Sequence, residues 1–242
     1  MSDKDNIYTD NESMIVDFSF DEKVVKVFPD MIRRSVPGYE SIITMIGLLA
    51  EEYAQQDSNI YDLGCSLGAA TLAMIRNVKE SGCNIIAVDN AKAMIEKCQS
   101  NPDFKNNHIE TTWRYSDIQD IDIDNASVVV MNFTLQFIPP VERFDLIQKI
   151  YNGLKPGGVL ILSEKIIFAN ELEQDEQERL HLAFKKANGY SDLEISQKRN
   201  ALENILLPDT LLLHQERLHS VGFSRSQVWF QCFNFASLLA IK

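Results

Sequence analysis

The chain has 242 residues, of which 45% are hydrophobic, so it is long enough to bury one sizeable core. Its formal net charge of -12 at pH 7 argues against an extended nucleic-acid footprint, which needs clustered Lys and Arg, and favours a small-molecule substrate. The first residues are polar, and no apolar stretch is long enough to span a bilayer. We therefore expect a cytoplasmic protein that makes no contact with a membrane.

Four cysteines are spread along the chain without a Cys-x-x-Cys pair or a histidine partner. This spacing indicates neither a zinc site nor a disulfide framework, so we expect reduced thiols and no bound metal. The cysteines are Cys65, Cys83, Cys98 and Cys232.

In chain order, residues 1–19 are polar and uneven and predict a loose N-terminal arm, and residues 20–242 predict one α/β domain. Apolar side chains at helical spacing over residues 20–36 are interrupted by Pro29, and a second, amphipathic helix is predicted over residues 39–54. Strand-like and helix-like runs then alternate, as is typical of a mostly parallel sheet with helices on both faces. We place strands near 59–63, 84–88, 109–113, 127–132 and 158–163, and two more within 228–242.

The stretch over residues 59–72 is the most informative, because a buried strand breaks there into a small-residue loop and then a helix. Gly64 and Gly68 can adopt positive φ and admit a ligand close to the backbone, facing the amides that open the helix. The dinucleotide fingerprint is not met, since Ser66 stands where it has a glycine. The looser acidic-x-Gly-x-Gly-x-Gly loop of S-adenosylmethionine (SAM) enzymes fits better, with Asp62 as the acid. An ordinary strand-to-helix turn is the alternative.

Polar side chains also follow the next three strands. Asp89 ends the second strand, where doubly wound sheets commonly bind a ribose hydroxyl pair. Asp117 follows the third and would accept from an adenine amino group while the Ile118 amide donates to the ring; a turn or helix cap is the alternative. Asn132 ends the fourth strand at the edge where open α/β sheets hold ligands, and an amide that merely ends a strand is the alternative.

Residues 164–221 separate the fifth strand from the last two and predict a helical insertion that carries the substrate-specific surface. A capping box, Ser191-Asp-Leu-Glu194, starts a helix at its second residue. One stripe of this helix is apolar, and Lys198 and Arg199 flank it. These cations either snorkel from a packed face or hold a ligand carboxylate. The stripe consists of Ile195, Leu202, Ile205 and Leu206.

Two runs, Ser35-Val-Pro-Gly-Tyr39 and Ile195-Ser-Gln-Lys-Arg199, are absent from most generic methyltransferases. With further runs they resemble the bacterial carboxy-S-adenosylmethionine (carboxy-SAM) synthase family of the class I SAM-dependent methyltransferase superfamily. The resemblance covers residues 20–242 and implies a Rossmann-like fold, with a mostly parallel seven-stranded sheet and the helical insertion before its last two strands. The further runs begin at Phe20, Val27, Tyr61, Asn132, Ala187, Leu202 and Trp229.

By this resemblance, the protein would convert SAM and prephenate into carboxy-SAM and phenylpyruvate. A separate enzyme would use carboxy-SAM to form 5-oxyacetyluridine at the wobble position of tRNA. The SAM methyl group would lose a proton, and the resulting sulfonium ylide would capture the CO2 released from prephenate. SAM would be a co-substrate, and the protein would be a homodimer that binds neither a metal nor nucleic acid.

The resemblance also assigns roles to individual residues. Arg199 would pair with the new carboxylate and is the single residue expected to be catalytic. No side chain stands out as the base for the methyl proton, and the resemblance suggests that the hydroxide lost from prephenate serves. The SAM contacts would be Tyr39, Gly64, Cys65, Ser66, Asp89, Asn90, Asp117, Ile118 and Asn132, together with Arg199.

The residues leave two other functions open. An ordinary methyltransferase acting on a small molecule or on tRNA would share every SAM contact and differ only in residues 164–221. A non-catalytic SAM-binding protein is the second, because this chemistry requires no diagnostic catalytic dyad.

Overall fold

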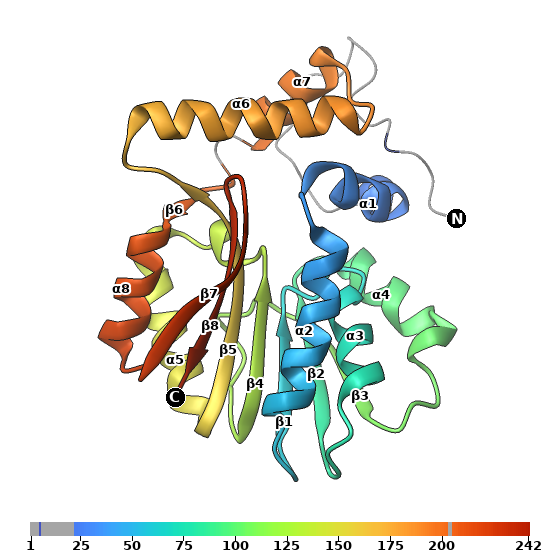
Figure 1. The fold of residues 1–242 in the computed structure, drawn as a ribbon. Coiled ribbons are helices and arrows are strands. Elements are labelled where there is room, and N and C mark those ends of the chain that lie inside the picture. The colour runs from blue at the N-terminus through green and yellow to red at the C-terminus, as the bar shows by residue number, and fades with distance from the viewer. Residues whose placement is uncertain (1–4, 6–21, 203–204) are drawn as a thin grey trace.

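The computed structural model describes Asp5, residues 22–202 and residues 205–242 (Figure 1). The predicted arm, residues 1–19, lies outside this part of the chain apart from Asp5. The Asp5 residue is only 2% exposed, and its contacts bear on the site described below.

All seven predicted strands are present, with one short addition. Their bounds are β1 (Asn59–Leu63), β2 (Asn84–Asp89), β3 (Glu110–Tyr115), β4 (Ala126–Asn132), β5 (Leu154–Ile167), β6 (Asp209–Thr210), β7 (Arg225–Cys232) and β8 (Phe235–Ile241). The sheet order is β3-β2-β1-β4-β5-β8-β7, and β6 pairs with the end of β5. Strands β1 to β5 pair in parallel, whereas β8 runs antiparallel to both β5 and β7. The predicted mostly parallel, seven-stranded sheet is confirmed.

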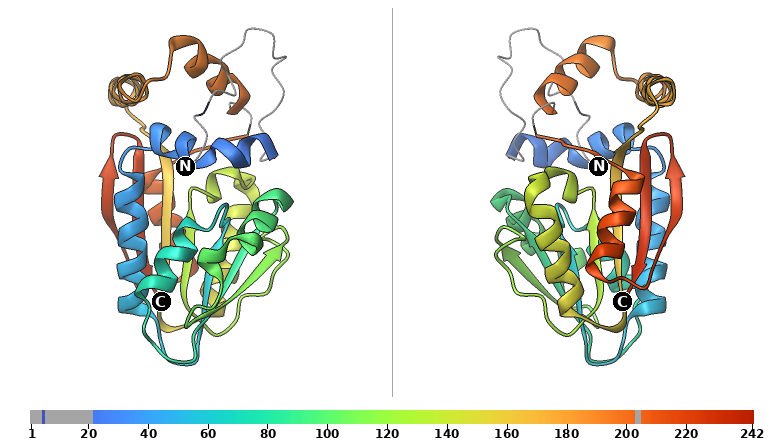
Figure 2. Two further views of the ribbon diagram at one scale, coloured as in Figure 1. Left: turned by 90° about the vertical axis from the view of Figure 1, so that its right-hand side faces the viewer. Right: turned by 90° about the vertical axis from the view of Figure 1, so that its left-hand side faces the viewer.

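Helices cover both faces of this sheet and one of its ends (Figures 1 and 2). Helices α2 (Tyr39–Tyr53), α3 (Ala69–Asn77) and α4 (Lys92–Ser100) pack on one face, and α5 (Arg143–Gly153) and α8 (Leu211–Val221) on the other. The central strands are therefore buried on both sides, which explains why β4 reads as a continuous apolar run. Helices α1 (Glu22–Ser35), α6 (Glu171–Ala187) and α7 (Asp192–Leu202) lie across the carboxyl ends of the strands.

Helix α1 is continuous through Pro29, where an interruption was predicted. A proline inside a helix removes one backbone hydrogen bond and costs about 3 kcal/mol. Burial of Val24, Val27 and Met31 on one face of α1 offsets this cost, because those side chains pack beneath the helix. The break predicted after α1 is confirmed at Gly38, whose φ of 73° suits glycine and whose Cβ would clash with Phe230.

The insertion over residues 164–221 is mostly helical, as predicted, but its first residues continue strand β5 and one of its two predicted cations is buried. Strand β5 runs on to Ile167, because residues past Ser163 still pair with β8 and then with β6. Helix α7 starts at Asp192 as the capping box predicts, and its described part runs to Leu202. Ile205 and Leu206 follow residues 203–204, which the structure does not describe, and the Leu206 N–H donates to the Leu202 carbonyl at 2.9 Å. Lys198 lies on the buried face of α7 instead of flanking it.

A buried ion cluster ties the insertion to the sheet. The Arg143 guanidinium is 1% exposed and donates to Asp209 Oδ2 at 2.7 Å, and Arg217 donates to the same oxygen at 2.6 Å. Burial alone would raise the pKa of Asp209, but hydrogen bonds from both arginines and their charges hold it below its ordinary value. Arg143 also donates to the Ile138 and Leu207 carbonyls, so one side chain links three segments.

We predict that Asp209→Ala lowers the free energy of unfolding by about 3 to 5 kcal/mol, because it leaves two buried guanidiniums without a counter-charge. Urea denaturation followed by circular dichroism measures this loss. The exposed Asp122 provides a matched control, and Asp122→Ala should change stability by less than about 0.5 kcal/mol. Equal stability of the two variants would contradict the prediction.

Candidate functional site

A cavity of about 850 Å³ lies between the carboxyl ends of the strands and the helices α1, α6 and α7. The fold thus brings together residues from six separate segments, all placed at one edge of the sheet. Every residue predicted to bind SAM or the new carboxylate lines this cavity: Tyr39, Gly64, Cys65, Ser66, Asp89, Asn90, Asp117, Ile118, Asn132 and Arg199. Their individual roles stay predictions.

The loop after β1 forms the floor of the cavity. Gly64 has a φ of 80°, and a Cβ at this position would lie 2.2 Å from Thr134 Oγ1, so only glycine fits. Ser66, which replaces the middle glycine of the motif, also has a positive φ, 49°. The backbone therefore keeps the glycine-type turn at a residue that bears a side chain, and Gly68 then begins α3.

Asp89 at the tip of β2 is held by the backbone on both sides. Its carboxylate accepts the N–H of Ser66 at 2.8 Å and the N–H of Ala91 at 2.8 Å. Burial raises the pKa of Asp89, while these two hydrogen bonds oppose the rise. The carboxylate is thus fixed at the edge of the cavity, in the position that suits a ribose hydroxyl pair.

Asp62 lies deeper, behind the same loop. It is 1% exposed and accepts a hydrogen bond from Thr71 Oγ1 at 2.5 Å. Burial, with a smaller contribution from the charge of Asp89, raises the pKa of Asp62 to about 6, against the effect of hydrogen bonds from Thr71. The loop is therefore backed by a second acidic group.

Asp117 lines the cavity, and its backbone carbonyl also begins a turn, because it accepts the N–H of Asp120 at 3.1 Å. Its Oδ1 accepts a hydrogen bond from Asn90 Nδ2 at 2.7 Å, which joins the loops after β2 and β3. Ile118 is buried beside it, and both residues line the cavity. An exposed carboxylate above a buried aliphatic side chain suits the polar edge and the flat face of an adenine ring.

Asn132 at the end of β4 has an unused acceptor. Its Oδ1 is buried and has no hydrogen-bond partner among the described residues. A buried acceptor without a partner costs about 1 to 3 kcal/mol, so a donor group on a ligand would stabilise this residue. The observation favours a ligand contact over an amide that merely ends a strand.

Arg199 on α7 lines the cavity with a largely exposed side chain. Its side chain is 70% exposed, and its Nη2 lies 3.9 Å from Glu178 Oε2. Lys198, the other predicted cation, is buried and belongs to the α7 core. Lys198 is therefore buried and Arg199 is exposed, a difference that the apolar stripe in the sequence did not predict.

The sequence interpretation missed three basic side chains in the cavity: Lys165 on β5 and His181 and Lys185 on α6. A signal for Lys165 was available, because it lies two residues after Ser163, the residue of β5 that pairs with Asn132 at the end of β4. The α6 pair has four-residue spacing, which places both on one face of a helix. Burial and the charge of Lys185 lower the pKa of His181 to about 3, so this imidazole is neutral and its Nε2 donates to the Ser35 carbonyl at 2.8 Å.

Charged residues line the cavity in two main groups. Three carboxylates lie in or just after strands β1, β2 and β3, and four cations come from β5, α6 and α7, with the carboxylate of Glu178 among them. Arg33 and Glu40, which pair with each other at 3.7 Å, also line the cavity. The acidic side suits a cationic nucleoside such as SAM, and the basic side suits an anion. We call the first group the acidic wall; it consists of Asp62, Asp89 and Asp117. We call the second group the basic wall; its cations are Lys165, Lys185, Lys198 and Arg199.

Other kinds of site have little support in the part of the chain that the structure describes. It contains no cluster of three or more His, Cys, Asp or Glu side chains arranged to hold a metal, and no helix long and apolar enough to cross a membrane. The four cysteines are unpaired, and burial raises the pKa of the Cys65 thiol well above its ordinary range.

The sheet order and the cavity at its carboxyl edge define a class I SAM-dependent methyltransferase fold, and residues 60–158 match the methyltransferase domain model. The plantazolicin methyltransferase, solved with an analogue and SAH, superposes with a TM-score of 0.63 at 12% identity, over 92% of this chain and 91% of that one. Magnesium protoporphyrin IX methyltransferase from Synechocystis PCC 6803 gives 0.60 at 14% identity, over 88% and 87%. At these identities the likeness concerns the fold alone.

Sequence relatives narrow the class. The chain is 55% identical to carboxy-S-adenosyl-L-methionine synthase of Aliivibrio fischeri strain MJ11 over the full length of both. It is 60% identical to the protein of the same name from Trichlorobacter lovleyi over 229 residues, 94% of each chain. The chain belongs to the carboxy-S-adenosyl-L-methionine synthase family.

We predict that Asp89→Ala weakens SAM binding by about 2 to 4 kcal/mol, because an alanine cannot replace two charge-assisted hydrogen bonds to a ribose. Isothermal titration calorimetry measures the change. Asp103 is an exposed carboxylate outside the cavity, so Asp103→Ala should bind SAM as the wild type does. Wild-type affinity in Asp89→Ala would remove this residue from the site.

Proposed function

We propose that the protein converts SAM into carboxy-SAM, with prephenate as the carboxyl donor and phenylpyruvate as the second product. Membership of the carboxy-SAM synthase family over the whole chain supports the reaction. The observation that carries the proposal is the charge division within one cavity, because this reaction brings a cationic sulfonium and an anionic carboxyl donor together. A methyl transfer to a neutral acceptor would give no reason for a basic wall beside the SAM site.

In this proposal the acidic wall orients SAM. Asp89 would bind the ribose hydroxyls, and Asp117 and the Ile118 amide would bind adenine. The Oδ1 of Asn132, which has no donor among the described residues, would accept a hydrogen bond from SAM. The loop at Gly64 would let the nucleoside lie against the backbone. Catalysis then rests on positioning and on charge stabilisation in a largely enclosed cavity.

The chemistry balances without a protein base. Prephenate, a dianion, breaks into phenylpyruvate, CO2 and hydroxide. The hydroxide takes a proton from the SAM methyl group, and the resulting carbanion attacks the carbon of CO2. The products are carboxy-SAM, phenylpyruvate and water.

Arg199 would bind the new carboxylate. A guanidinium near a sulfonium is unfavourable because the two positive charges repel, and the developing carboxylate offsets this repulsion. The planar fork of Arg199 can hold both oxygens of the carboxylate at once. The long contact to Glu178, at 3.9 Å, leaves the guanidinium able to turn toward the product.

We predict that Arg199→Ala binds SAM nearly normally, binds carboxy-SAM at least about 100-fold more weakly, and makes little carboxy-SAM. Arg199→Lys should recover part of the activity, because an ammonium keeps the charge but loses the fork. Calorimetry with both ligands and mass spectrometry of the product measure these effects. An equal loss of both affinities would make Arg199 structural.

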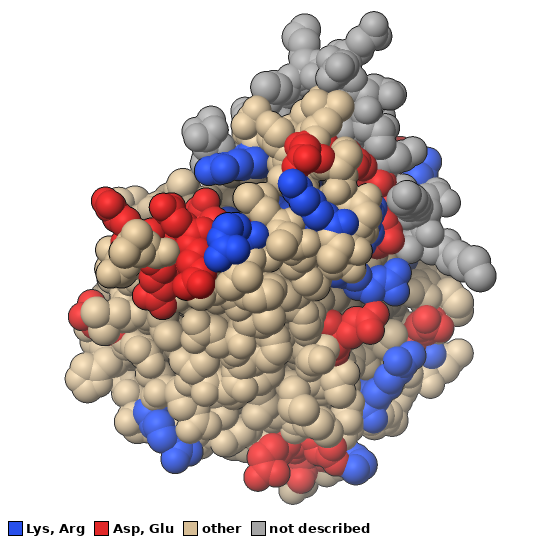
Figure 3. Space-filling model, turned by 45° about the horizontal axis from the view of Figure 1, so that its top comes forward, with Lys and Arg blue, Asp and Glu red and all other residues tan. Residues whose placement is uncertain are grey.

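A methyltransferase acting on tRNA is the main alternative, and surface charge argues against it. On the described part of the face in Figure 3, Lys and Arg are scattered among groups of Asp and Glu and form no continuous basic stripe. Each phosphate contact needs a cation, and the chain has 23 Lys and Arg against 35 Asp and Glu.

We therefore predict that unmodified tRNA is not retained at micromolar protein concentration in a filter assay at about 0.15 M salt. Submicromolar retention would favour the tRNA methyltransferase. A known tRNA methyltransferase run in parallel controls for the quality of the tRNA.

Mass spectrometry of the ligand that co-purifies with the protein tests the reaction class directly. Carboxy-SAM supports the proposed function, plain SAM favours a methyltransferase or a non-catalytic SAM-binding protein, and NAD would overturn the class. We further propose that the protein is a cytoplasmic homodimer, as the family resemblance implies, and light scattering after gel filtration measures its mass.

A further inference from the structure

Two lysines on the basic wall of the cavity have no counter-charge in contact among the residues that the structure describes. Lys165, at the end of β5, and Lys185, on α6, are both half-buried and line the cavity. Neither ammonium forms a hydrogen bond or an ion pair with a described residue, unlike Lys186, which pairs with Asp192 at 2.6 Å on the surface. Partly buried cations are usually paired, so this arrangement points to an absent anion.

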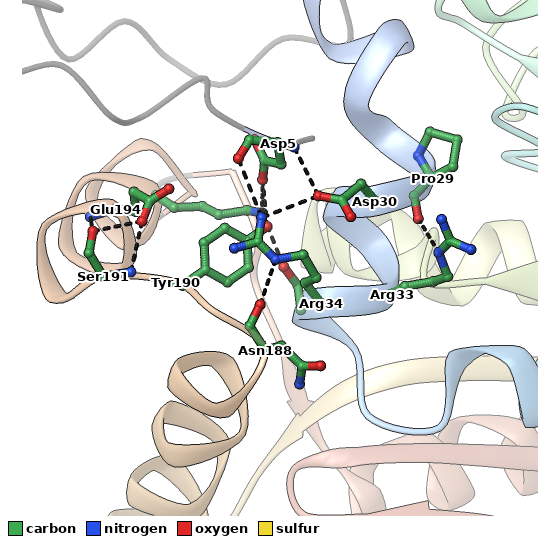
Figure 4. A network of polar contacts seen from close by, with 11 residues as sticks. Asp5, Pro29, Asp30, Arg33, Arg34, Asn188, Tyr190, Ser191 and Glu194 are labelled. Carbon is green, nitrogen blue, oxygen red and sulfur yellow. Dashed lines mark hydrogen bonds and ion pairs between the residues drawn. The ribbon is translucent and has the colours of Figure 1, made fainter. Parts of the chain in front are cut away.

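The third lysine of the wall, Lys198, is already neutralised. Its Nζ lies 3.4 Å from Asp5 Oδ2 and donates to Tyr190 Oη at 3.2 Å and to Ser35 Oγ at 3.1 Å. Asp5 also accepts a hydrogen bond from Tyr190 Oη at 2.5 Å, and the Arg34 guanidinium stacks on the Tyr190 ring (Figure 4). Lys198 thus secures α7 to the N-terminal segment and is not available to a ligand.

Among the described residues of the basic wall, the remaining positive charges outnumber the negative charges. Glu178 is the one carboxylate among the described residues that lies in this part of the cavity, and its ion pair there is with Arg199. Three cations, Lys165, Lys185 and Arg199, therefore face one carboxylate, which leaves a surplus of two positive charges. This surplus occurs in a chain whose net charge is -12, so it is not a consequence of overall composition.

The pKa of each lysine reports the same imbalance. Burial, together with the charges of Lys198, Lys165 and Arg199, lowers the pKa of Lys185 to about 7. Burial also lowers the pKa of Lys165, although Glu178 opposes this shift. An anion bound between the two ammoniums would remove the repulsion and restore their charged forms.

We infer that Lys165 and Lys185 bind the carboxylates of a dianionic second substrate, while Arg199 serves the carboxylate formed on SAM. The inference rests on the proposed function in taking that substrate to be the dicarboxylate prephenate, whose two negative charges equal the surplus of the basic wall. Because the two lysines come from β5 and α6, they would grip the substrate from two elements and hold it over the methyl group. They are positioning and specificity residues and take no part in the bond changes.

The experiment compares Lys165→Gln, Lys185→Gln and Lys185→Arg with the wild type and with Lys186→Gln. Lys186 is the next residue along α6 and points away from the cavity, which makes it a matched control for loss of one charge. For each protein, calorimetry gives the affinity for SAM and, on the SAM-loaded protein, the affinity for prephenate. Steady-state kinetics give KM and kcat for carboxy-SAM formation.

Each Gln variant should bind prephenate about 10-fold to 100-fold more weakly and raise its KM by a similar factor, since a charge-assisted hydrogen bond is lost. SAM affinity should change by less than about twofold, because the lysines lie on the opposite wall. Lys185→Arg should retain most of the prephenate affinity, and Lys186→Gln should match the wild type. A structural role would lower both affinities together.

The outcomes separate this inference from the proposed function. Wild-type protein that makes carboxy-SAM, with Gln variants that bind prephenate normally, overturns the inference and leaves the function standing. Wild-type protein that binds prephenate through the two lysines but makes no carboxy-SAM overturns the function and supports the inference. Wild-type protein that does not bind prephenate overturns the inference.

Discussion

The site depends on the close approach of two loops, the one after β1 and the one after β4. Gly64 leaves no room for a Cβ beside Thr134, so the two loops touch through backbone and one side chain. The second loop is fixed from below by Glu164, whose carboxylate accepts the N–H groups of Leu135 at 2.8 Å and Gln136 at 3.0 Å. Burial raises the pKa of Glu164 to about 8, against the effect of these hydrogen bonds. The floor of the cavity is thus held by a buried acid at the end of β5.

Gln136, one of the two residues held by Glu164, also connects the floor of the cavity to the segments above it. Gln136 accepts the N–H of Lys165 through its side chain and the N–H of Leu207 through its carbonyl. Arg143 and Asp209 then tie the Leu207 segment to α5 and α8. Floor and basic wall therefore share one network of buried polar groups, so the distance between the two halves of the cavity is set by hydrogen bonds and not by loop packing alone.

The two halves of the cavity use charge in opposite ways. On the strand side, carboxylates accept backbone and side-chain donors, and they range from the buried Asp62 to the exposed Asp117. On the helix side, cations project from β5, α6 and α7 with one carboxylate among them. In the proposed function, the strand side would bind the cationic SAM and the helix side would bind the anionic second substrate. The second substrate would then be selected by the side of the cavity that the insertion contributes.

Much of the fold and part of the site follow from local patterns in the sequence. Apolar runs predict the seven strands, because burial on both faces leaves no polar alternation. The capping box predicts the start of α7, and Asp89 and Asn132 can be placed at the cavity because parallel strands end at one edge. The interruption predicted at Pro29 was wrong, because the free-energy cost of a proline inside the helix is offset by side-chain packing that exists only in the folded structure.

The sequence by itself determined the class of the domain, the order of its elements and the nucleoside side of its cavity, because each depends on residues close together in the chain. Only the tertiary structure decided which cations have partners. Lys198 and its partner Asp5 are 193 residues apart. Sequence spacing does not distinguish this paired lysine from Lys165 and Lys185, which have no ion-pair partner among the described residues. The charge of a wall is the sum of side chains from distant segments, and that sum exists only once the segments have been brought together.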